Sequence, residues 1–143
     1  MSAPTIHATT VAFARDGGWR AVLLTGRSGS GKSDLALRLI DRGAMLVSDD
    51  YTDLRAEDGR LLATPPPRIA GRIEVRGLGL VSVPHLAEAA VALVAVLDAT
   101  PERMPDPAVA TLAGIAVPRI ALRPFEASAP IKLERALDLG GVA

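Results

Sequence analysis

The stretch that decides the fold runs from Trp19 to Arg42 and reads WRAVLLTGRSGSGKSDLALRLIDR. Its first residues, through Leu24, are typical of a buried strand, and residues 34–42 have the apolar spacing of an amphipathic helix. Between them, residues 26–33 match the pattern Gly-x-x-x-x-Gly-Lys-Ser. A glycine-rich loop between a strand and a helix is the arrangement that binds nucleotide phosphates. The stretch therefore predicts an α/β domain with a phosphate-binding loop.

The residues of this loop have separate expected roles. Glycines let the backbone curl so that N–H groups point inward at phosphate oxygens, and the N-terminus of the following helix adds partial positive charge. Lys32 is expected to reach the β- and γ-phosphates of ATP, and the Ser33 hydroxyl to bind Mg²⁺. An accidental glycine-rich turn is the alternative, which the full motif in its full context disfavours. The nucleotide-binding residues are predicted to be Gly26, Ser28, Gly29, Ser30, Gly31, Lys32 and Ser33.

The segments outside the loop are mostly short strands separated by turns. Two runs, Ile6–Ala14 and Trp19–Leu24, flank Asp16-Gly17-Gly18 and predict an antiparallel hairpin. A second hairpin is expected over residues 51–63, around Asp58-Gly59. The other expected elements are a strand over 44–48, extended segments over 73–76 and 81–83, a strand over 90–97, a short helix over 109–113, an edge strand over 115–122 because of Pro118, and a helix over 128–139.

Composition narrows the class of protein. The chain has 143 residues, which favours one domain, and 49% of them are hydrophobic. Lysine and arginine total 16, as do aspartate and glutamate, so the charge balance argues against an electrostatic nucleic-acid binder. The sequence contains no cysteine, no apolar run of about 20 residues, and no signal-peptide pattern at the start. We therefore expect a cytoplasmic protein that does not act on nucleic acid or membranes.

A pair of carboxylates, Asp49-Asp50, follows the strand predicted after the helix, 16 residues beyond Ser33. In an α/β sheet the end of that strand faces the same crevice as the phosphate loop. A carboxylate there can hold Mg²⁺ or accept a hydroxyl proton, and two close carboxylates can divide these roles. The alternative is an ordinary acidic turn after a strand.

Charged residues also gather beside Gly77-Leu78-Gly79. Arg76 could stabilise charge on a transferring phosphate, and Glu74 could complete a Mg²⁺ shell. Taken alone, such a cluster is more often solvated surface charge. His7 lies on the strand paired with the one that feeds the loop, and taken alone it is more often a structural than a catalytic histidine.

Five segments occur in an order that resembles one family. They are Ile6-His7, GRSGSGKS, SDLALRLIDRG, LVSDD and IEVRGLGLVSV. Together they resemble the C-terminal catalytic domain of the bacterial HPr kinase/phosphorylases, over about residues 6–98. The last segment is close to a signature of that family. The resemblance implies a P-loop fold of the phosphoenolpyruvate carboxykinase/HPr kinase type, with a mixed central sheet and flanking helices.

The resemblance also implies an activity, which is ATP- and Mg²⁺-dependent phosphorylation of a serine on an HPr-like phosphocarrier protein of a phosphotransferase system. Asp49 would be the base, His7 would hydrogen-bond near Asp49 and hold it, and Arg76 would face the transferring phosphate. Ser33, Asp50 and Glu74 would form the metal site. Family members form hexamers, so a homo-oligomer is expected.

Three departures from the family qualify these expectations. The chain starts almost at the catalytic core, so we expect one catalytic domain over residues 1–143 with no N-terminal regulatory domain. Family members carry a loop close to Val-Arg-Pro-Gly-Arg-Asn, and the matching residues 122–127 read LRPFEA. Because the later arginine of that loop handles phosphate, kinase activity is expected to exceed reverse phosphorolysis. The family's final helix, which helps to grip the carrier, is expected to be missing or short.

Two other functions remain open from the sequence. The chain could be a P-loop kinase for a small metabolite, or a nucleotide-binding sensor that works through partner contacts without catalysis.

Overall fold

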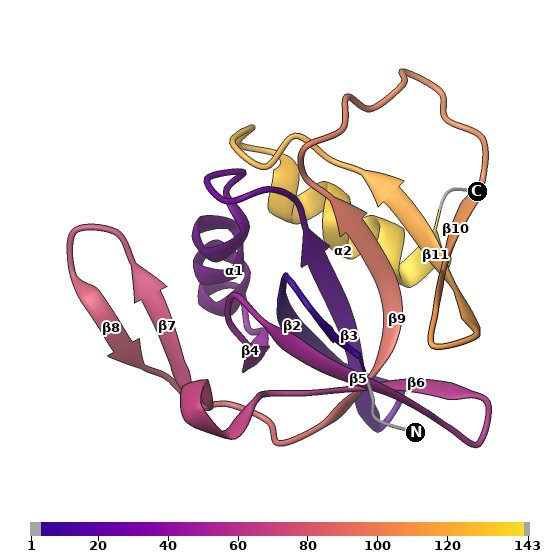
Figure 1. Cartoon of the computed structure of the whole chain (residues 1–143). Coiled ribbons are helices and arrows are strands. Elements are labelled where there is room, and N and C mark those ends of the chain that lie inside the picture. Colours follow the sequence, from indigo (N-terminus) through magenta and orange to yellow (C-terminus); the bar gives the residue numbers. More distant parts are fainter. Residues whose placement is uncertain (1–3, 142–143) are drawn as a thin grey trace.

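A nine-stranded sheet forms the centre of the protein in this computed structural model, which describes residues 4–141 (Figure 1). Two α-helices pack against it. Neither helix of the described residues is long and apolar enough to cross a membrane. The elements are β1 Thr5–Ile6, β2 Ala8–Arg15, β3 Gly18–Thr25, α1 Lys32–Asp41, β4 Met45–Ser48, β5 Thr52–Glu57, β6 Arg60–Thr64, a 3-10 turn Pro67–Ile69, β7 Arg72–Val75, β8 Gly79–Ser82, β9 Ala89–Val96, β10 Ala108–Leu112, β11 Ile115–Ala121 and α2 Ala129–Leu139.

The main path of the sheet is β1-β5-β6-β9-β3-β2-β4, and β11 followed by β10 branches from β9. Strand β9 runs parallel to both β3 and β11. Parallel strands end at the same edge of a sheet, so the phosphate loop after β3 lies beside the segment after β9. The backbone N–H of Arg27 donates to Oδ2 of Asp98 at 3.1 Å, which joins these two segments. The expected mixed sheet is therefore observed.

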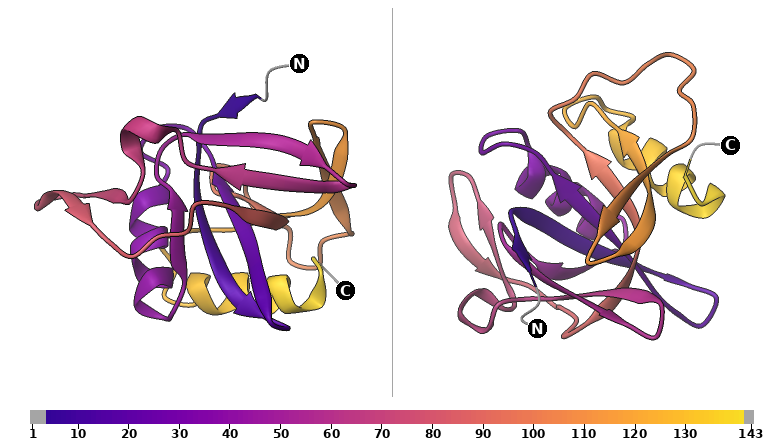
Figure 2. Two further views of the ribbon diagram at one scale, coloured as in Figure 1. Left: turned by 90° about the horizontal axis from the view of Figure 1, so that it is seen from below. Right: turned by 45° about the vertical axis from the view of Figure 1, so that its right-hand side comes forward.

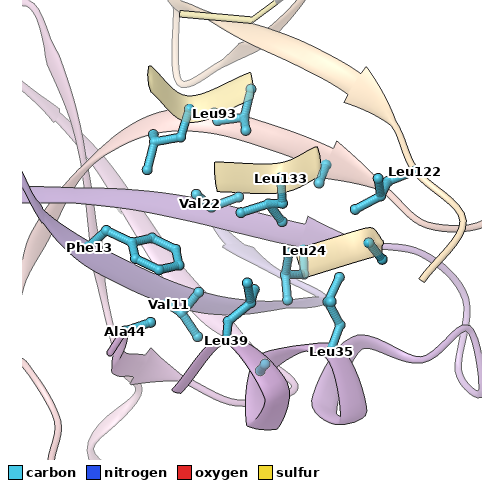
Figure 3. Packing of buried hydrophobic residues seen from close by; sticks show 14 of the residues in the cluster. Val11, Phe13, Val22, Leu24, Leu35, Leu39, Ala44, Leu93, Leu122 and Leu133 are labelled. Atoms are coloured by element: carbon cyan, nitrogen blue, oxygen red, sulfur yellow. The ribbon is translucent and has the colours of Figure 1, made fainter. Parts of the chain in front are cut away.

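Side chains alternate between the two faces of the central strands, as a period of two residues requires. Val22 and Leu24 of β3 point into a core shared with α1 and α2, whereas Ala21 and Leu23 point into a second core shared with β5 and β6. The left view of Figure 2 places α2 and the β5–β6 hairpin on opposite sides of the molecule. Figure 3 shows Leu133 of α2 above Val22 and Leu24. Both faces of β3 are buried, which explains its nearly continuous apolar sequence.

The predicted hairpins are confirmed. Strands β2 and β3 pair over their full length around Asp16-Gly17, and β5 pairs with β6 around Asp58-Gly59. Strands β7 and β8 form a separate two-stranded hairpin that projects from the body, as the left side of Figure 1 shows.

Two predictions near the C-terminus are wrong. Residues 109–113 were expected to be helical, but β10 pairs with β11 around Ala113 and Gly114, which both have positive φ angles. The second error concerns β11, which is not an edge strand because it pairs with β10 and with β9. Pro118 is tolerated there because the pairing with β9 begins only at Arg119, one residue later.

Candidate functional site

The phosphate loop connects the end of β3 to the start of α1 and has the curled backbone that its sequence predicts. Gly26 has a φ of 149° and Gly31 has a φ of 100°, both in the region that favours glycine. Lys32 is 6% exposed, and its Nζ donates to the carbonyl oxygens of Gly26 at 2.7 Å and Arg27 at 3.0 Å. The lysine ammonium is thus held against the inside of the loop.

Asp49 is the most heavily bonded carboxylate of the site. Its Oδ1 accepts from the Ser33 hydroxyl at 2.7 Å and from the Thr9 hydroxyl at 3.0 Å, and its Oδ2 accepts from the backbone N–H of Glu74 at 2.9 Å. The residue is 6% exposed. These bonds join α1, β2 and β7 at one carboxylate. Asp49 therefore lies beside Ser33, the motif serine that is expected to bind Mg²⁺, and both of its oxygens accept hydrogen bonds.

Asp50 faces the other way and is paired with the histidine that the sequence singled out. His7 Nε2 lies 2.8 Å from Asp50 Oδ1, so His7 bonds to Asp50 rather than to Asp49 as expected. Thr10 of β2 pairs with Ser48 of β4, which brings the residues just beyond β4 to the start of β2. There Thr9 contacts Asp49, and the preceding His7 contacts Asp50. The Tyr51 ring centroid is 5.3 Å from that of His7.

Asp50 also has an unusual backbone conformation, with a φ of 69°. Aspartate tolerates this left-handed region better than most residues, at some cost in free energy. Its side chain is 59% exposed. The conformation directs two adjacent carboxylates differently, one toward the loop and one toward solvent.

The charged segment around β7 is only partly brought into the site. Buried Ile73 anchors β7 in the core shared with α1, which places the backbone of Glu74 at Asp49. The side chains of Glu74 and Arg76 form no ion pair or side-chain hydrogen bond within residues 4–141, and Arg76 is exposed. The structure thus brings His7, Lys32, Ser33 and both aspartates together and leaves Arg76 exposed in the turn between β7 and β8.

Thr9 is a site residue that sequence reasoning missed. Its hydroxyl donates to Asp49 and accepts from the backbone N–H of Asp50 at 3.1 Å, and the residue is fully buried. The available signal was weak, because threonine is common in strands for its shape alone. A buried hydroxyl two residues after His7 on the same face could have suggested the connection.

A cavity of about 830 Å³ opens beside the loop. A volume of this size falls in the usual range for small-molecule sites. Its lining comes from three segments, which are residues 27–30 of the loop, residues 97–100 after β9, and residues 123–126 after β11.

The residues present fit a magnesium–triphosphate group. The Ser30 hydroxyl is buried in the loop without a hydrogen-bond partner among the described residues, as a group that awaits a ligand would be. Ser33 and Asp49 offer adjacent oxygen ligands of the kind Mg²⁺ prefers. Within residues 4–141, no cluster of three or more histidine, cysteine, aspartate or glutamate side chains could hold a metal.

Comparison with known proteins agrees with this geometry. The family model "HPr Serine kinase C-terminal domain" matches residues 5–92, more than half of the chain. HPr kinase/phosphorylases from Clostridium tetani and Clostridium botulinum strain Eklund 17B are 49% and 48% identical to the chain over 65 residues. Those 65 residues cover 46% of this chain and 21% of each relative. The chain thus matches about a fifth of the length of these curated relatives.

A solved structure extends the similarity beyond the sequence match. The Hpr(Ser) kinase/phosphatase from Coxiella burnetii superposes with a TM-score of 0.78 and 31% sequence identity. The superposition covers 95% of this chain and 89% of that one, so it includes the C-terminal third. Both the resemblance read from the segments and the expected P-loop fold are confirmed. The chain belongs to the HPr serine kinase C-terminal domain family.

Proposed function

We propose that the chain is an ATP- and Mg²⁺-dependent serine protein kinase that acts on an HPr-like phosphocarrier protein. The observation that carries the proposal is the Ser33–Asp49 hydrogen bond of 2.7 Å, with the His7–Asp50 pair directly beside it. This arrangement supplies one carboxylate at the metal-binding serine and a second that is open to an incoming hydroxyl. Family membership favours HPr as the substrate over a small metabolite.

The loop would hold the triphosphate through its backbone N–H groups and the Lys32 ammonium, which would exchange its bonds to loop carbonyls for phosphate oxygens. Ser33 and Asp49 would hold Mg²⁺, and Glu74 would complete the shell from the strand that already bonds to Asp49. Bound Mg²⁺ neutralises phosphate charge as the terminal group is transferred.

The geometry favours Asp50 as the base, with Asp49 at the metal, which reverses the division expected from the resemblance. Both oxygens of Asp49 accept hydrogen bonds, and the residue is buried. Oδ2 of Asp50 has no partner within residues 4–141, and the side chain is half-exposed. His7 would act as a positioning residue, because it restrains the other oxygen of Asp50.

The substrate serine oxygen forms a bond to the γ-phosphorus while the bond between that phosphorus and the β–γ bridging oxygen breaks. ADP leaves with the electron pair of the broken bond, and Asp50 accepts the serine proton. Arg76, in the turn between β7 and β8, would stabilise charge on the transferring phosphate.

Several further features belong to the proposal and rest on the family alone. They are a homo-oligomeric, hexameric assembly, a cytoplasmic location, and a reverse phosphorolysis that is slower than the kinase reaction. The last follows from Glu126 in the C-terminal loop, where the family carries its later arginine.

The direct test incubates the purified chain with γ-labelled ATP, Mg²⁺ and an HPr-like carrier protein. We expect labelled phosphoserine on the carrier. Transfer to a small molecule with an unlabelled carrier would support a metabolite kinase, and nucleotide binding without any transfer would support a sensor.

Asp50→Asn and Asp49→Asn variants test the division of roles. If Asp50 is the base, its variant lowers the transfer rate about 10²- to 10⁴-fold and leaves Mg²⁺-ATP affinity unchanged. Asparagine also tolerates the left-handed backbone of this position, so the comparison is clean. The Asp49 variant should weaken Mg²⁺-ATP binding as well as transfer. Asp58→Asn, in the distant β5–β6 turn, is the matched control.

The opposite pattern would return the base role to Asp49. That pattern is near-normal transfer by the Asp50 variant, together with lost transfer and intact Mg²⁺-ATP affinity in the Asp49 variant. Transfer rates and binding constants measured on the same preparations separate the two assignments.

A further inference from the structure

A turn near the C-terminus lies directly over the phosphate loop. A methyl group placed on Gly31 would lie 2.8 Å from Cζ of Phe125 and 3.2 Å from Cγ of Pro124. Figure 1 shows the segment between β11 and α2 beside the loop that precedes α1. Residues about 94 positions apart in sequence therefore meet at one end of the candidate site.

The backbone of this turn is held without help from the Phe125 ring. The Arg38 guanidinium donates to the carbonyl oxygens of Pro124 and Glu126. Leu122 is buried, and its N–H donates to the carbonyl of Val96 at 3.0 Å. The position of Phe125 is thus determined by its neighbours, and its ring is not needed to hold the turn in place.

The ring is 69% exposed although it touches the loop. It lines the cavity of about 830 Å³ together with Leu97, the following residues 98–100 and the loop itself. The ring, Leu97 and Ala99 give this cavity, whose other lining residues are mostly polar, an apolar patch beside the phosphate-binding loop. The patch and the loop match the two halves of a nucleotide, one flat and one anionic. Few other aromatics are available, since only 3% of the chain is aromatic.

We propose that Phe125 is the stacking wall for the base of the bound nucleoside triphosphate. The proposal rests on the proposed function, because it assigns the other end of the same ligand. Stacking on an aromatic face is tolerant of base identity, since every base presents a π-face. The cavity should therefore accept ATP and GTP with similar dependence on the ring.

The test compares ligands with and without a base. Dissociation constants are measured with Mg²⁺ for ATP, GTP and inorganic tripolyphosphate on wild type and on Phe125→Ala, Phe125→Leu and Phe125→Trp. The ring is exposed and the turn is anchored elsewhere, so all variants should fold, which circular dichroism checks. Trp19→Ala, an exposed aromatic at the opposite end of β3 from the loop, is the control.

If the ring stacks on the base, the Ala and Leu variants weaken ATP and GTP about tenfold and leave tripolyphosphate within about twofold of wild type. The Trp variant should keep wild-type affinity because it restores the aromatic face. Equal weakening of all three ligands would mean that the ring supports the loop instead. Full rescue by leucine would mean apolar packing alone, and either result would overturn the proposal.

Failure of this inference is distinguishable from failure of the proposed function. If wild type binds ATP and transfers phosphate but the Phe125 variants bind ATP normally, only the stacking role fails. If wild type binds neither ATP nor tripolyphosphate, the kinase proposal fails and the stacking role fails with it.

Discussion

The phosphate-site region, residues 18–50, and the C-terminal region, residues 98–140, are built in different ways. In the first, the loop, Lys32 and Ser33 come from one strand–loop–helix–strand succession, and both side chains find partners within 16 residues. In the second, the contacts span the chain, as when Arg38 holds Pro124 and Arg15 holds Asp138. The family model matches residues 5–92 only, whereas the structural match covers 95% of the chain. The first region is therefore recognisable from its sequence, because its functional residues are close together in the chain. The C-terminal region is recognisable only from its structure, because its contacts join distant residues.

The comparison predicts that a charge removed from the first region affects binding without affecting the fold. Lys32→Met should weaken Mg²⁺-ATP binding and lower the transfer rate by at least about 10³-fold, because the proposed role of the ammonium is to bind the phosphates. Its hydrogen bonds go only to loop carbonyls, so the thermal unfolding midpoint should change little. Lys132→Met, from the C-terminal region, is the matched control and should retain wild-type affinity. Normal transfer by the Lys32 variant would show that the ammonium does not take part in phosphate binding.

Substitution of a core residue in the second region should lower the stability of the fold. Leu133 of α2 is fully buried against the central sheet (Figure 3). Leu133→Ala should lower the free energy of unfolding by about 2–5 kcal/mol, measured by urea denaturation. Ile131→Ala on the same helix changes an exposed side chain and should stay within about 0.5 kcal/mol. Equal losses in the two variants would show that α2 does not pack as described.

The smallest change in the free energy of unfolding is expected at the cluster of ion pairs between α2 and the arginines of β2 and α1's C-terminal end. Arg15 of β2 donates to Asp138 at 2.7 Å and to Glu134 at 3.2 Å, and Arg42 after α1 donates to Glu134 at 2.6 Å. Arg15→Gln should cost about 1 kcal/mol or less, and less still at high salt. Arg20→Gln, which removes an exposed local pair with Asp16, is the control.

The pKa of Arg15 sets the pH range over which this cluster contributes to the free energy of unfolding. The hydrogen bond to Asp138 raises the pKa of Arg15 above its usual value. A raised pKa contributes stability that is complete below the unfolded-state value and is lost only as pH rises through the folded-state value. The Arg15 contribution should therefore be constant from about pH 6 to pH 9. A marked change within that window would contradict the assignment.

Much of the fold could be predicted because local signals agreed with the tertiary result. Asp16-Gly17 and Asp58-Gly59 are strong hairpin turns, and both hairpins form as predicted. The β10–β11 hairpin was missed because its turn is Ala113-Gly114, and alanine is a poor residue for a φ of 50°. The sequence therefore lacked the usual turn signal.

Some features of the candidate site could likewise be predicted from the sequence, and others could not. The loop and the position of Asp49 near Ser33 followed from motif and spacing. The partner of His7 did not, because it depends on the register of β2 with β4, which begins at Thr10 and Ser48, and on the left-handed backbone of Asp50 that follows. A shift of one residue would have reversed the side chains, and sequence alone does not specify register at that precision.

By itself, the sequence determined the phosphate loop, the pair of aspartates beyond it and the family to which the chain belongs. Each of these is specified by a short run of consecutive residues. Which aspartate faces the loop, and the contact of Phe125 with Gly31, depend on how distant segments pack. Those relations arise where strands and turns far apart in the chain are brought together by burial of a shared core, and no local pattern encodes them.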